Sequence, residues 1–387
     1  MSERKPRILV LGGGPGGLVA SRRLAEILRG KAEIVLVEKT GRHLFPPSLI
    51  WVMTGERSPE DIAKPLDGLK RFGIKVIKAS VERIDPSEGK VETSEGSLTY
   101  DYLIVALGSI PRPESIEGGG VCSPWTIEGA LRCRELLSKL KRGAGLEVVA
   151  GAWSWPYKCP PAPFEVAFLV KYILSELRGL DAKVRVVHFW KEPMEPFGPS
   201  MVGAFKTFMN KYGIEYISGF KPVSAENGYL VSEGGDKVGF DIAVMAPPHE
   251  PPKPVRESEL ADDSLGGYMK VDKVTLRHPK YDNVFGVGDV ISPALGIGMA
   301  GVFAHFEAEY VASQIADEVL GTYAGQDYNR SGICVMDLGY VGAAVYCDFK
   351  DKILGRSEYP RCVMMGGMKA FRIFKYAFEK LWFARWL

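Results

Sequence analysis

No stretch of about 20 apolar residues occurs anywhere in the 387 residues, so we expect no helix that crosses a bilayer. The N-terminus lacks the apolar run and the small-residue cleavage site of a signal peptide, so none is expected. The six cysteines form neither a C-x-x-C pair nor a zinc spacing. We therefore expect no disulfide scaffold, although one or two cysteines could be redox-active.

An excess of charge of one sign is also missing. Lys and Arg total 49 and Asp and Glu total 47, which leaves a net charge of +2 and gives no reason to expect a nucleic-acid partner. Hydrophobic residues make up 46% and charged residues 25%, which excludes disorder and collagen as whole-chain interpretations. At roughly 100–200 residues per domain, the chain should form two or three domains.

What the sequence does contain begins with a nucleotide-binding pattern. Residues 7–11 form a short apolar run of the buried parallel-strand type, and glycines at 12, 14 and 17 follow in the spacing G-x-G-x-x-G. A helical stretch over 18–28 and a second strand over 33–37 lead to Glu38. Glycines allow close backbone approach, a helix N-terminus attracts a pyrophosphate, and the carboxylate accepts ribose hydroxyls. The pattern predicts a dinucleotide site without separating FAD from NAD.

Two later segments favour FAD. Residues 102–107 form an apolar strand that ends at Gly108, and residues 283–287 form another that ends at Gly288-Asp289. In flavoproteins of the disulfide-reductase type such an aspartate lies beside the ribityl chain, whereas a plain NAD dehydrogenase has no use for this third element. The order of the three elements therefore predicts bound FAD.

Several short motifs along the chain resemble one family. Residues 45–51 (F-P-P-S-L-I-W) with E-D-I at 60–62, residues 271–278, G-V-F-A-H at 301–305 and A-F-E-K at 377–380 occur in the order found in sulfide:quinone oxidoreductases. The resemblance covers nearly the whole chain. It implies an α/β fold with two Rossmann-like domains, FAD as the cofactor, and a C-terminal amphipathic helix at a membrane surface.

We predict the following domain organisation. Residues 1–114 and 255–325 form a discontinuous FAD domain, 115–254 a degenerate NAD-binding-like domain with a redox cysteine, and 326–387 a quinone- and membrane-binding segment. The predicted FAD-binding residues are Gly12, Gly14, Pro15, Gly16, Gly17, Glu38, Lys39, Ser48, Val81, Ala106, Gly108, Gly288, Asp289, Gly301 and Val302.

The middle domain lacks a second nucleotide loop. Its strands are expected at 146–151 and 184–189, but the first is followed by G-A-W-S-W-P at 151–156 where a further G-x-G-x-x-G would stand. Trp153 and Trp155 would fill the space that a pyrophosphate needs. The sequence thus disfavours NADH binding and a type II NADH:quinone oxidoreductase.

Two cysteines are candidates for the redox pair. Cys159 lies in a proline-rich loop that opens a helix near Phe164, so its pKa is expected to be lowered. Cys334 begins a C-x-x-D-x-G segment similar to one in the family. The resemblance implies that Cys159 and Cys334 form the pair, linked directly or through extra sulfur.

The remaining cysteines and one acid receive separate predictions. By resemblance, Cys122 takes the place of a third family cysteine with a catalytic or flavin-attaching role, and Glu165 could relay protons, or could simply interact with its helix dipole. Cys133 and Cys347 are expected in the core, and nothing supports a role for Cys362. Met299 stands where many members have a lysine, which removes a positive charge near the flavin.

The last 19 residues, 369–387, predict an amphipathic helix. Five aromatic or apolar residues share one face and Arg372, Lys375 and Glu379 the other, and two tryptophans stand near the end. This pattern is typical of an interfacial membrane anchor, with a terminal helix docked on the core as the alternative. The resemblance implies that Ile333 and Phe378 flank a quinone ring and that Lys375 lies near a quinone carbonyl. Deletion of the helix is expected to free the protein from membranes and to remove quinone reduction, while sulfide still bleaches the flavin.

The sequence therefore predicts an enzyme that oxidises sulfide through Cys159, Cys334 and FAD and reduces a membrane quinone. We expect a peripheral protein on the cytoplasmic membrane that forms a homo-oligomer, with no nucleic-acid partner and no metal. Three alternatives stay open: a type II NADH:quinone oxidoreductase, a flavocytochrome-type sulfide dehydrogenase, and a non-enzymatic FAD-bound scaffold.

Overall fold

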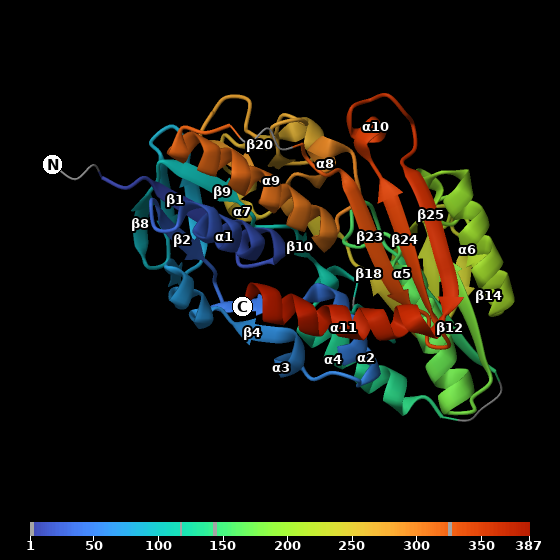
Figure 1. Ribbon diagram of the computed structural model, residues 1–387. Coiled ribbons are helices and arrows are strands. Elements are labelled where there is room, and N and C mark those ends of the chain that lie inside the picture. The colour runs from blue at the N-terminus through green and yellow to red at the C-terminus, as the bar shows by residue number, and fades with distance from the viewer. Residues whose placement is uncertain (1–3, 117, 142–144, 324–326) are drawn as a thin grey trace.

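The computed structural model describes residues 4–116, 118–141, 145–323 and 327–387 (Figure 1). Two five-stranded parallel sheets and a three-stranded antiparallel sheet make up its main layers. Within the described residues, no helix is long and apolar enough to cross a membrane.

The first parallel sheet combines strands from widely separated parts of the chain. Its order is β22-β9-β1-β2-β5, and α1 and α9 pack against each other beside it. The elements are β1 (Arg7–Leu11), α1 (Pro15–Leu28), β2 (Glu33–Val37), β5 (Ile74–Ile77), β9 (Tyr102–Val105), β22 (Val284–Gly286) and α9 (Gly301–Leu320), with the antiparallel sheet β6 (Val81–Asp85), β7 (Lys90–Thr93) and β8 (Gly96–Thr99).

The second parallel sheet has the order β11-β18-β12-β13-β14. Its strands are short apolar runs with few polar residues, as expected for strands covered on both faces. The elements are β11 (Val121–Cys122), α4 (Ile127–Lys139), β12 (Leu146–Ala152), α5 (Ala162–Lys171), β13 (Ala182–Val187), α6 (Pro199–Lys211), β14 (Ile214–Ile217) and β18 (Ile242–Ala246), with the antiparallel sheet β15 (Pro222–Glu226), β16 (Tyr229–Ser232) and β17 (Lys237–Gly239).

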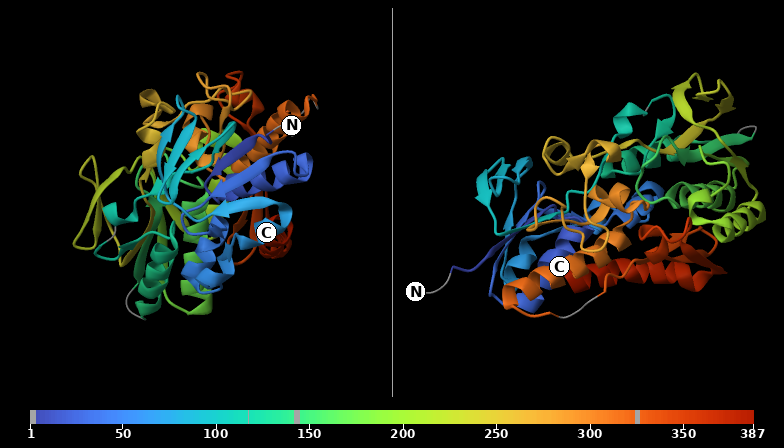
Figure 2. Two further views of the ribbon diagram at one scale, coloured as in Figure 1. Left: turned by 90° about the vertical axis from the view of Figure 1, so that its left-hand side faces the viewer. Right: turned by 90° about the horizontal axis from the view of Figure 1, so that it is seen from above.

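The C-terminal part is an antiparallel sheet followed by a long helix. Strands β23 (Ser331–Asp337), β24 (Gly342–Asp348) and β25 (Arg361–Met368) pair in sequence order, and α11 (Lys369–Trp386) runs back across β23 and β24. The two further views in Figure 2 show that α11 lies at the edge of the molecule. Helix α5 packs against β12 and β13 and also against β23, so it joins the second and third sheets.

Shorter elements connect these layers. They are β3 (Arg42–Leu44), η1 (Pro46–Ser48), α2 (Leu49–Thr54), α3 (Pro59–Ile62), β4 (Ala63–Pro65), η2 (Asp67–Phe72), β10 (Ile110–Pro111), η3 (Pro113–Ser115), η4 (Tyr172–Leu177), η5 (Glu195–Phe197), β19 (His249–Glu250), α7 (Lys253–Arg256), β20 (Ala261–Asp262), η6 (Asp263–Leu265), β21 (Tyr268–Met269), η7 (Gly288–Val290), α8 (Ser292–Leu295) and α10 (Lys350–Ile353).

Candidate active site

The glycine loop between β1 and α1 has the geometry that its spacing predicts. Gly12 has φ +100°, and a Cβ added there would overlap the carbonyl oxygen of Ala106. A Cβ at Gly17 would overlap the carbonyl oxygen of Gly12, so both positions require glycine for the fold itself. A Cβ at Gly14, in contrast, would meet no atom within 4 Å. Gly14 is therefore the place where the loop leaves room beside the backbone.

Glu38 lies next to this loop at the end of β2. Its carboxylate accepts hydrogen bonds from the Gly13 N–H at 2.8 Å and from Thr40 N and Oγ1 at 3.0 Å each. Ser48, predicted to contact FAD, donates its hydroxyl to Glu379 at 2.6 Å. The hydroxyl of Ser48 is thus used to hold α11.

Asp289 follows β22 and is partly covered. Burial raises the pKa of its carboxyl above the ordinary value, and the neighbouring Lys158 opposes part of this rise. The Lys158 ammonium lies 3.6 Å from the carboxylate. A positive charge therefore stands at this site even though residue 299 is methionine, because Lys158 supplies it.

These residues fit the flavin nucleotide that the sequence predicts. The first turn of α1 starts at Gly14 and the first turn of α9 starts at Ala300, and neither start has a side-chain cap. A Cβ at Gly301 would lie 3.5 Å from Pro15 Cγ, so the two helix starts lie close together. Backbone N–H groups there suit a pyrophosphate, and Glu38 and Asp289 supply carboxylates for ribose and ribityl hydroxyls.

The loop that carries Cys159 is joined to the start of α9. The Cys159 N–H donates to the Met299 carbonyl at 2.8 Å, and Lys158 pairs with Met299 as a parallel bridge. Cys159 itself has φ +61°, an uncommon conformation for a residue with a side chain. The hydrogen bond to Met299 and the backbone conformation together hold Cys159 beside the start of α9, where the FAD site is predicted.

Cys159 and Cys334 come together, and both are free thiols. A side-chain hydrogen bond with Cys334, burial, and the negative charge of Cys334 and Glu165 raise the pKa of Cys159 well above its usual value, while Lys375 lowers it. The prediction of a lowered pKa was wrong, because the hydrogen bond with Cys334 and burial outweigh any effect of the start of α5.

Glu165 and Lys375 form a buried ion pair beside the thiols. The same Glu165 oxygen accepts the Asp337 N–H at 2.5 Å. Burial raises the pKa of Glu165, and the charge of Lys375 opposes this rise. Burial lowers the pKa of Lys375, but the charge of Glu165 outweighs this effect and raises that pKa above its ordinary value. Lys375 therefore stands next to the cysteine pair through Glu165, a contact that sequence alone did not predict.

Asp337 holds the strand that carries Cys334. Its carboxylate accepts from Trp51 Nε1 at 3.1 Å, from Arg372 Nε at 3.1 Å, and from the Gly339 N–H at 2.8 Å. The indole of Trp51 stacks on Tyr376 with ring centroids 4.2 Å apart. Trp51 and Asp337 belong to the motifs that resemble the family, but their contact joins residues 286 apart in the chain.

The other four cysteines form two disulfides. Cys122 is bonded to Cys133 and Cys347 to Cys362. The prediction that Cys122 has a catalytic or flavin-attaching role is thus corrected, since its sulfur is already bonded and the side chain is fully buried. Cys133 and Cys347 are buried as expected, but they are also bridge partners, and Cys362 gains a structural role.

Helix α11 faces the protein with its polar side. Lys375 and Glu379 are buried, and Arg57 donates to Glu379 at 3.0 Å. Four apolar side chains are exposed, Ile373, Phe374, Phe378 and Leu381, at 67%, 45%, 43% and 62%. Lys380 and Arg385 are exposed as well. The helix is therefore docked on the protein, the alternative at the sequence level, through Lys375, Glu379 and its two tryptophans, and it leaves an apolar row exposed.

The two tryptophans of α11 are buried, contrary to the sequence interpretation that they face a membrane. Trp382 Nε1 donates to His43 Nε2 at 2.9 Å, and His43 Nδ1 lies 2.8 Å from the Gly13 carbonyl. Helix α11 thus contacts both the support of the glycine loop and Glu165. That sulfide still bleaches a protein without this helix stays a prediction.

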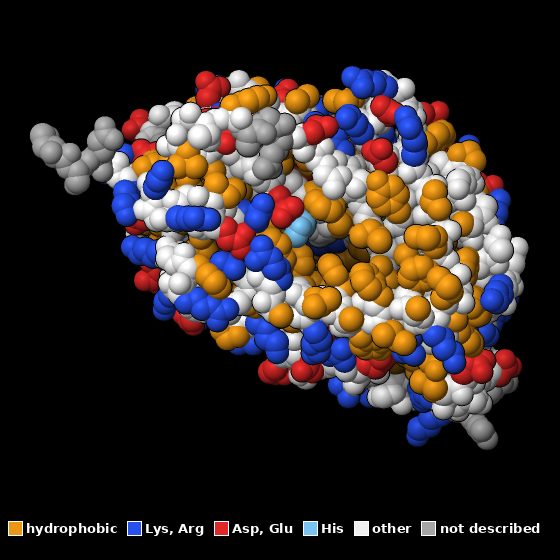
Figure 3. All heavy atoms as spheres, viewed as in Figure 1, with side chains coloured by type: hydrophobic (Ala, Val, Ile, Leu, Met, Phe, Trp, Pro, Cys, Tyr) orange, Lys and Arg blue, Asp and Glu red, His pale blue; other side chains and the backbone are white. Residues whose placement is uncertain are grey.

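The predicted quinone residues lie in different surroundings. Ile333 is 46% exposed on β23, and Phe378 is half-exposed with its ring 6.1 Å from that of Phe45. Figure 3 shows hydrophobic side chains gathered over β23–β25 and α11 on this face. The exposed members on the sheet are Ile333, Tyr346, Val363, Met365 and Met368.

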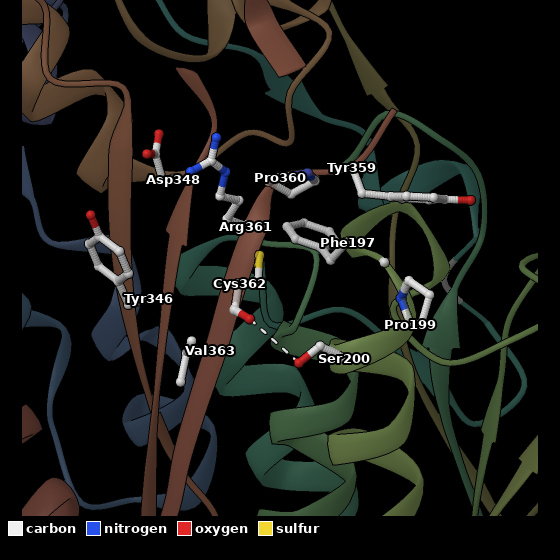
Figure 4. Close-up of a pocket in the computed structure, with 11 residues that line it drawn as sticks. Phe197, Pro199, Ser200, Tyr346, Asp348, Tyr359, Pro360, Arg361, Cys362 and Val363 are labelled. Carbon is white, nitrogen blue, oxygen red and sulfur yellow. Dashed lines mark hydrogen bonds between the residues drawn. The ribbon is translucent and has the colours of Figure 1, made fainter. Parts of the chain in front are cut away.

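A cavity of about 420 Å³ opens at the far end of this sheet (Figure 4). It lies between the start of α6 and strands β24 and β25, with Phe197, Tyr346 and Tyr359 among its lining residues. None of the cysteine-pair or FAD residues lines it, so this cavity is separate from the site described above.

Comparison with known proteins agrees with this geometry. Residues 6–152 match the family described as pyridine nucleotide-disulphide oxidoreductase. A mitochondrial sulfide:quinone oxidoreductase of Dictyostelium discoideum is 26% identical over 363 residues, covering 89% of this chain and 77% of the relative. A type II NADH:quinone oxidoreductase of Staphylococcus aureus is 27% identical over 317 residues, covering 75% of each.

One solved structure shows the same fold along almost the entire chain. The sulfide:quinone oxidoreductase of Aquifex aeolicus superposes with a TM-score of 0.84 at 24% identity, covering 97% of this chain and 91% of that chain. The chain is therefore an FAD-dependent oxidoreductase with a pyridine nucleotide-disulphide oxidoreductase fold, and its resemblance to the sulfide:quinone oxidoreductases is confirmed.

Proposed function

We propose that this protein oxidises sulfide at Cys159 and Cys334 and passes the electrons through FAD to a quinone. The observation that carries the proposal is the junction between the thiols and the flavin site: Cys159 donates its N–H to the carbonyl of Met299, two residues before α9. A cysteine pair attached to the FAD-binding helix start is what electron transfer from sulfur to flavin requires.

The chemistry begins from the oxidised pair. Hydrosulfide attacks the sulfur of Cys334, forms a new S–S bond there, and displaces the Cys159 sulfur as a thiolate. The Lys375 ammonium, which lowers the pKa of Cys159, stabilises this thiolate, and Glu165 holds Lys375 in place. Joining the Cys159 thiolate to the outer sulfur of the Cys334 persulfide forms a second S–S bond and releases two electrons, for which bound FAD would be the acceptor.

The outward apolar surface supports a membrane-bound acceptor. Four apolar side chains of α11 and those of β23–β25 are exposed on one face, where they would cost free energy in water. We propose that this face lies in the membrane interface, that Ile333 and Phe378 contact the quinone ring, and that Lys375 lies near a quinone carbonyl. The protein would then be peripheral.

The second parallel sheet carries the proposed degenerate nucleotide unit, residues 115–254, between the FAD unit at 1–114 and 255–325 and the segment 326–387. Residues 153–161 separate β12 from α5, so no helix starts directly at the strand end. The ring of Trp155 lies edge-on to that of Tyr157 and tilted against that of Trp190, with centroids 5.6 and 5.7 Å away. Aromatic side chains in this loop oppose pyrophosphate binding and disfavour NADH as the electron donor.

One anaerobic experiment tests the function. The purified yellow protein is mixed with sulfide and then with a short-chain quinone, and flavin absorbance is followed by stopped flow. We expect rapid bleaching by sulfide, recolouring by quinone, and slow or absent bleaching by NADH. Rapid bleaching by NADH and none by sulfide would establish the type II NADH:quinone oxidoreductase alternative.

A second experiment tests the membrane face. Leu381→Glu and Phe374→Glu change exposed residues of α11, whereas Leu177→Glu changes a residue of η4 that is 64% exposed and serves as a matched control. We expect the α11 variants to lose liposome flotation and quinone turnover while they retain FAD and bleaching by sulfide. Normal flotation of both variants would show that another surface binds the membrane.

A further inference from the structure

A buried carboxylic acid that the proposed reaction does not use lies directly beneath the flavin site. Glu307, two turns into α9, is fully buried. Its Oε2 accepts the Gly288 N–H at 2.5 Å, and its Oε1 accepts the Tyr328 hydroxyl at 3.0 Å. Both donors are neutral, and Gly288 directly precedes Asp289, so the acid fixes the backbone of the segment that carries the predicted ribityl-binding carboxylate.

No cation pairs with Glu307 among the described residues. The cation on the β22 side, Lys158, lies 3.6 Å from Asp289. On the β23 side, Arg330 donates to the Tyr328 carbonyl at 3.1 Å and pairs with Asp327 at 3.3 Å. The groups that influence Glu307 are thus Asp289, which is acidic, and Tyr328, which stacks on Tyr310 of α9.

The consequence for proton binding follows from these surroundings. Burial raises the pKa of Glu307 to about 7, the charge of Asp289 adds to the rise, and the hydrogen bonds from Gly288 and Tyr328 oppose it. A carboxyl in such a place gains or loses its proton near neutral pH. Negative charge added to the flavin site favours the protonated form, and loss of that charge favours release.

We propose that Glu307 is a positioning residue that binds a proton when the flavin site gains electrons and releases it when they leave. This rests on the proposed function for the source of the electrons, although any two-electron donor would drive the same uptake. The balance is one proton taken from solvent by the carboxylate for each two-electron reduction, in addition to protons bound by the cofactor itself. Glu307 does not touch the substrate.

The test measures the midpoint potential of the bound flavin by spectroelectrochemistry from pH 6 to pH 8.5. Each proton taken up with two electrons adds about 30 mV per pH unit to the slope. We expect wild type to show this additional slope above pH 7, and Glu307→Gln, which cannot ionise, to lack it. Tyr328→Phe removes a donor to the carboxylate, so the additional slope should begin at higher pH. Glu309→Gln, on the same helix but partly exposed, is the control and should match wild type.

A second measurement does not need bound flavin, so it can be made even if a variant fails to bind the cofactor. Between the ordinary carboxyl pKa and pH 7, the folded apoprotein should bind one more proton than the unfolded chain. Its melting temperature should therefore fall as the pH rises through that range, and more steeply than that of Glu307→Gln. If Glu307→Gln does not fold, the shift in Tyr328→Phe decides the matter.

Equal slopes in wild type and Glu307→Gln, or no shift in Tyr328→Phe, would overturn the proposal. A chemical reductant is used for the titration, so this result is independent of sulfide. Bleaching by sulfide with equal slopes would reject the role of Glu307 alone, whereas a Glu307-dependent slope without bleaching by sulfide would reject the proposed function alone.

Discussion

Two strand–loop–helix units in this molecule share a topology but use their loops in opposite ways. In the first, only residues 12–14 separate β1 from α1, and the loop consists of glycine. In the second, residues 153–161 separate β12 from α5, and the loop carries tryptophans, prolines and Cys159. The first loop presents backbone N–H groups and the second presents side chains. The comparison teaches that lengthening this turn removes the anion site at the helix start and makes room for a reactive thiol.

The strongest test of the first loop is Gly17→Ala. The added Cβ would overlap the Gly12 carbonyl oxygen, so we expect loss of FAD and of most soluble folded protein. Gly14→Ala adds the same methyl group where no atom lies within 4 Å, so this variant should fold. It should bind FAD more weakly than wild type, because the methyl group would occupy space assigned to the cofactor. Flavin content and melting temperature are measured for both. Equal FAD content in the two variants would contradict the assignment of the open side to the cofactor.

The matching test of the second loop is Cys159→Ala, together with Cys334→Ala. Each should abolish sulfide:quinone turnover and leave FAD bound, because the flavin contacts lie in the other loop. The double variant Cys122→Ala/Cys133→Ala removes a buried disulfide instead and should keep turnover within a few-fold, at a cost of about 2–4 kcal/mol in stability. Steady-state kinetics and chemical denaturation measure the two effects. Full activity of Cys334→Ala would remove it from the redox pair.

Low pH should weaken the hydrogen bonds by which His43 links the glycine loop to Trp382. Burial lowers the pKa of His43 to about 4, and the neutral ring accepts from Trp382. Since the pKa is lower in the folded state than the ordinary value of 6.5, the stability from neutral His43 is present above pH 6.5 and is lost as the pH falls through 4. At 1.36 kcal/mol per unit, this amounts to about 3 kcal/mol.

The measurement compares wild type with His43→Gln by thermal unfolding between pH 7 and pH 4. We expect the melting temperature of wild type to fall more steeply. Parallel curves would indicate that His43 contributes nothing to the acid sensitivity.

The smallest effect is expected at the exposed edge of the second loop. Trp155 is 43% exposed, and its ring contacts with Tyr157 and Trp190 should stabilise the fold by about 1 kcal/mol. Trp155→Ala should therefore lower the unfolding midpoint in denaturant slightly and leave bleaching by sulfide intact. A loss of several kcal/mol would show that the tryptophan organises the whole loop.

The sequence predicts local features of the fold well, and the reasons are physical. The glycine loop, Asp289 after its strand, and the candidate pair Cys159 and Cys334 follow from spacing or motif, because each depends on a few neighbouring residues. The two disulfides were missed because cysteine pairing depends on tertiary distance. The raised pKa of Cys159 was missed for the same reason, since Glu165 and Cys334 reach it only after folding.

The orientation of α11 shows this limit most clearly. Helical periodicity correctly predicted a polar and an apolar side but could not say which side faces the protein. The polar side has buried partners far back in the chain, at Ser48, Arg57 and Glu165, and these partners reverse the usual arrangement.

The bonds of α11 also constrain when the flavin site can be completed during synthesis. Trp382 donates to His43 across 339 positions, and Glu379 accepts from Ser48 across 331. Contacts of such long range form late, since the intervening chain must first be made and collapsed. A nascent chain that lacks α11 would leave His43 and Ser48 without these two hydrogen bonds. We therefore expect FAD to bind only after the C-terminal helix has been synthesised and has docked.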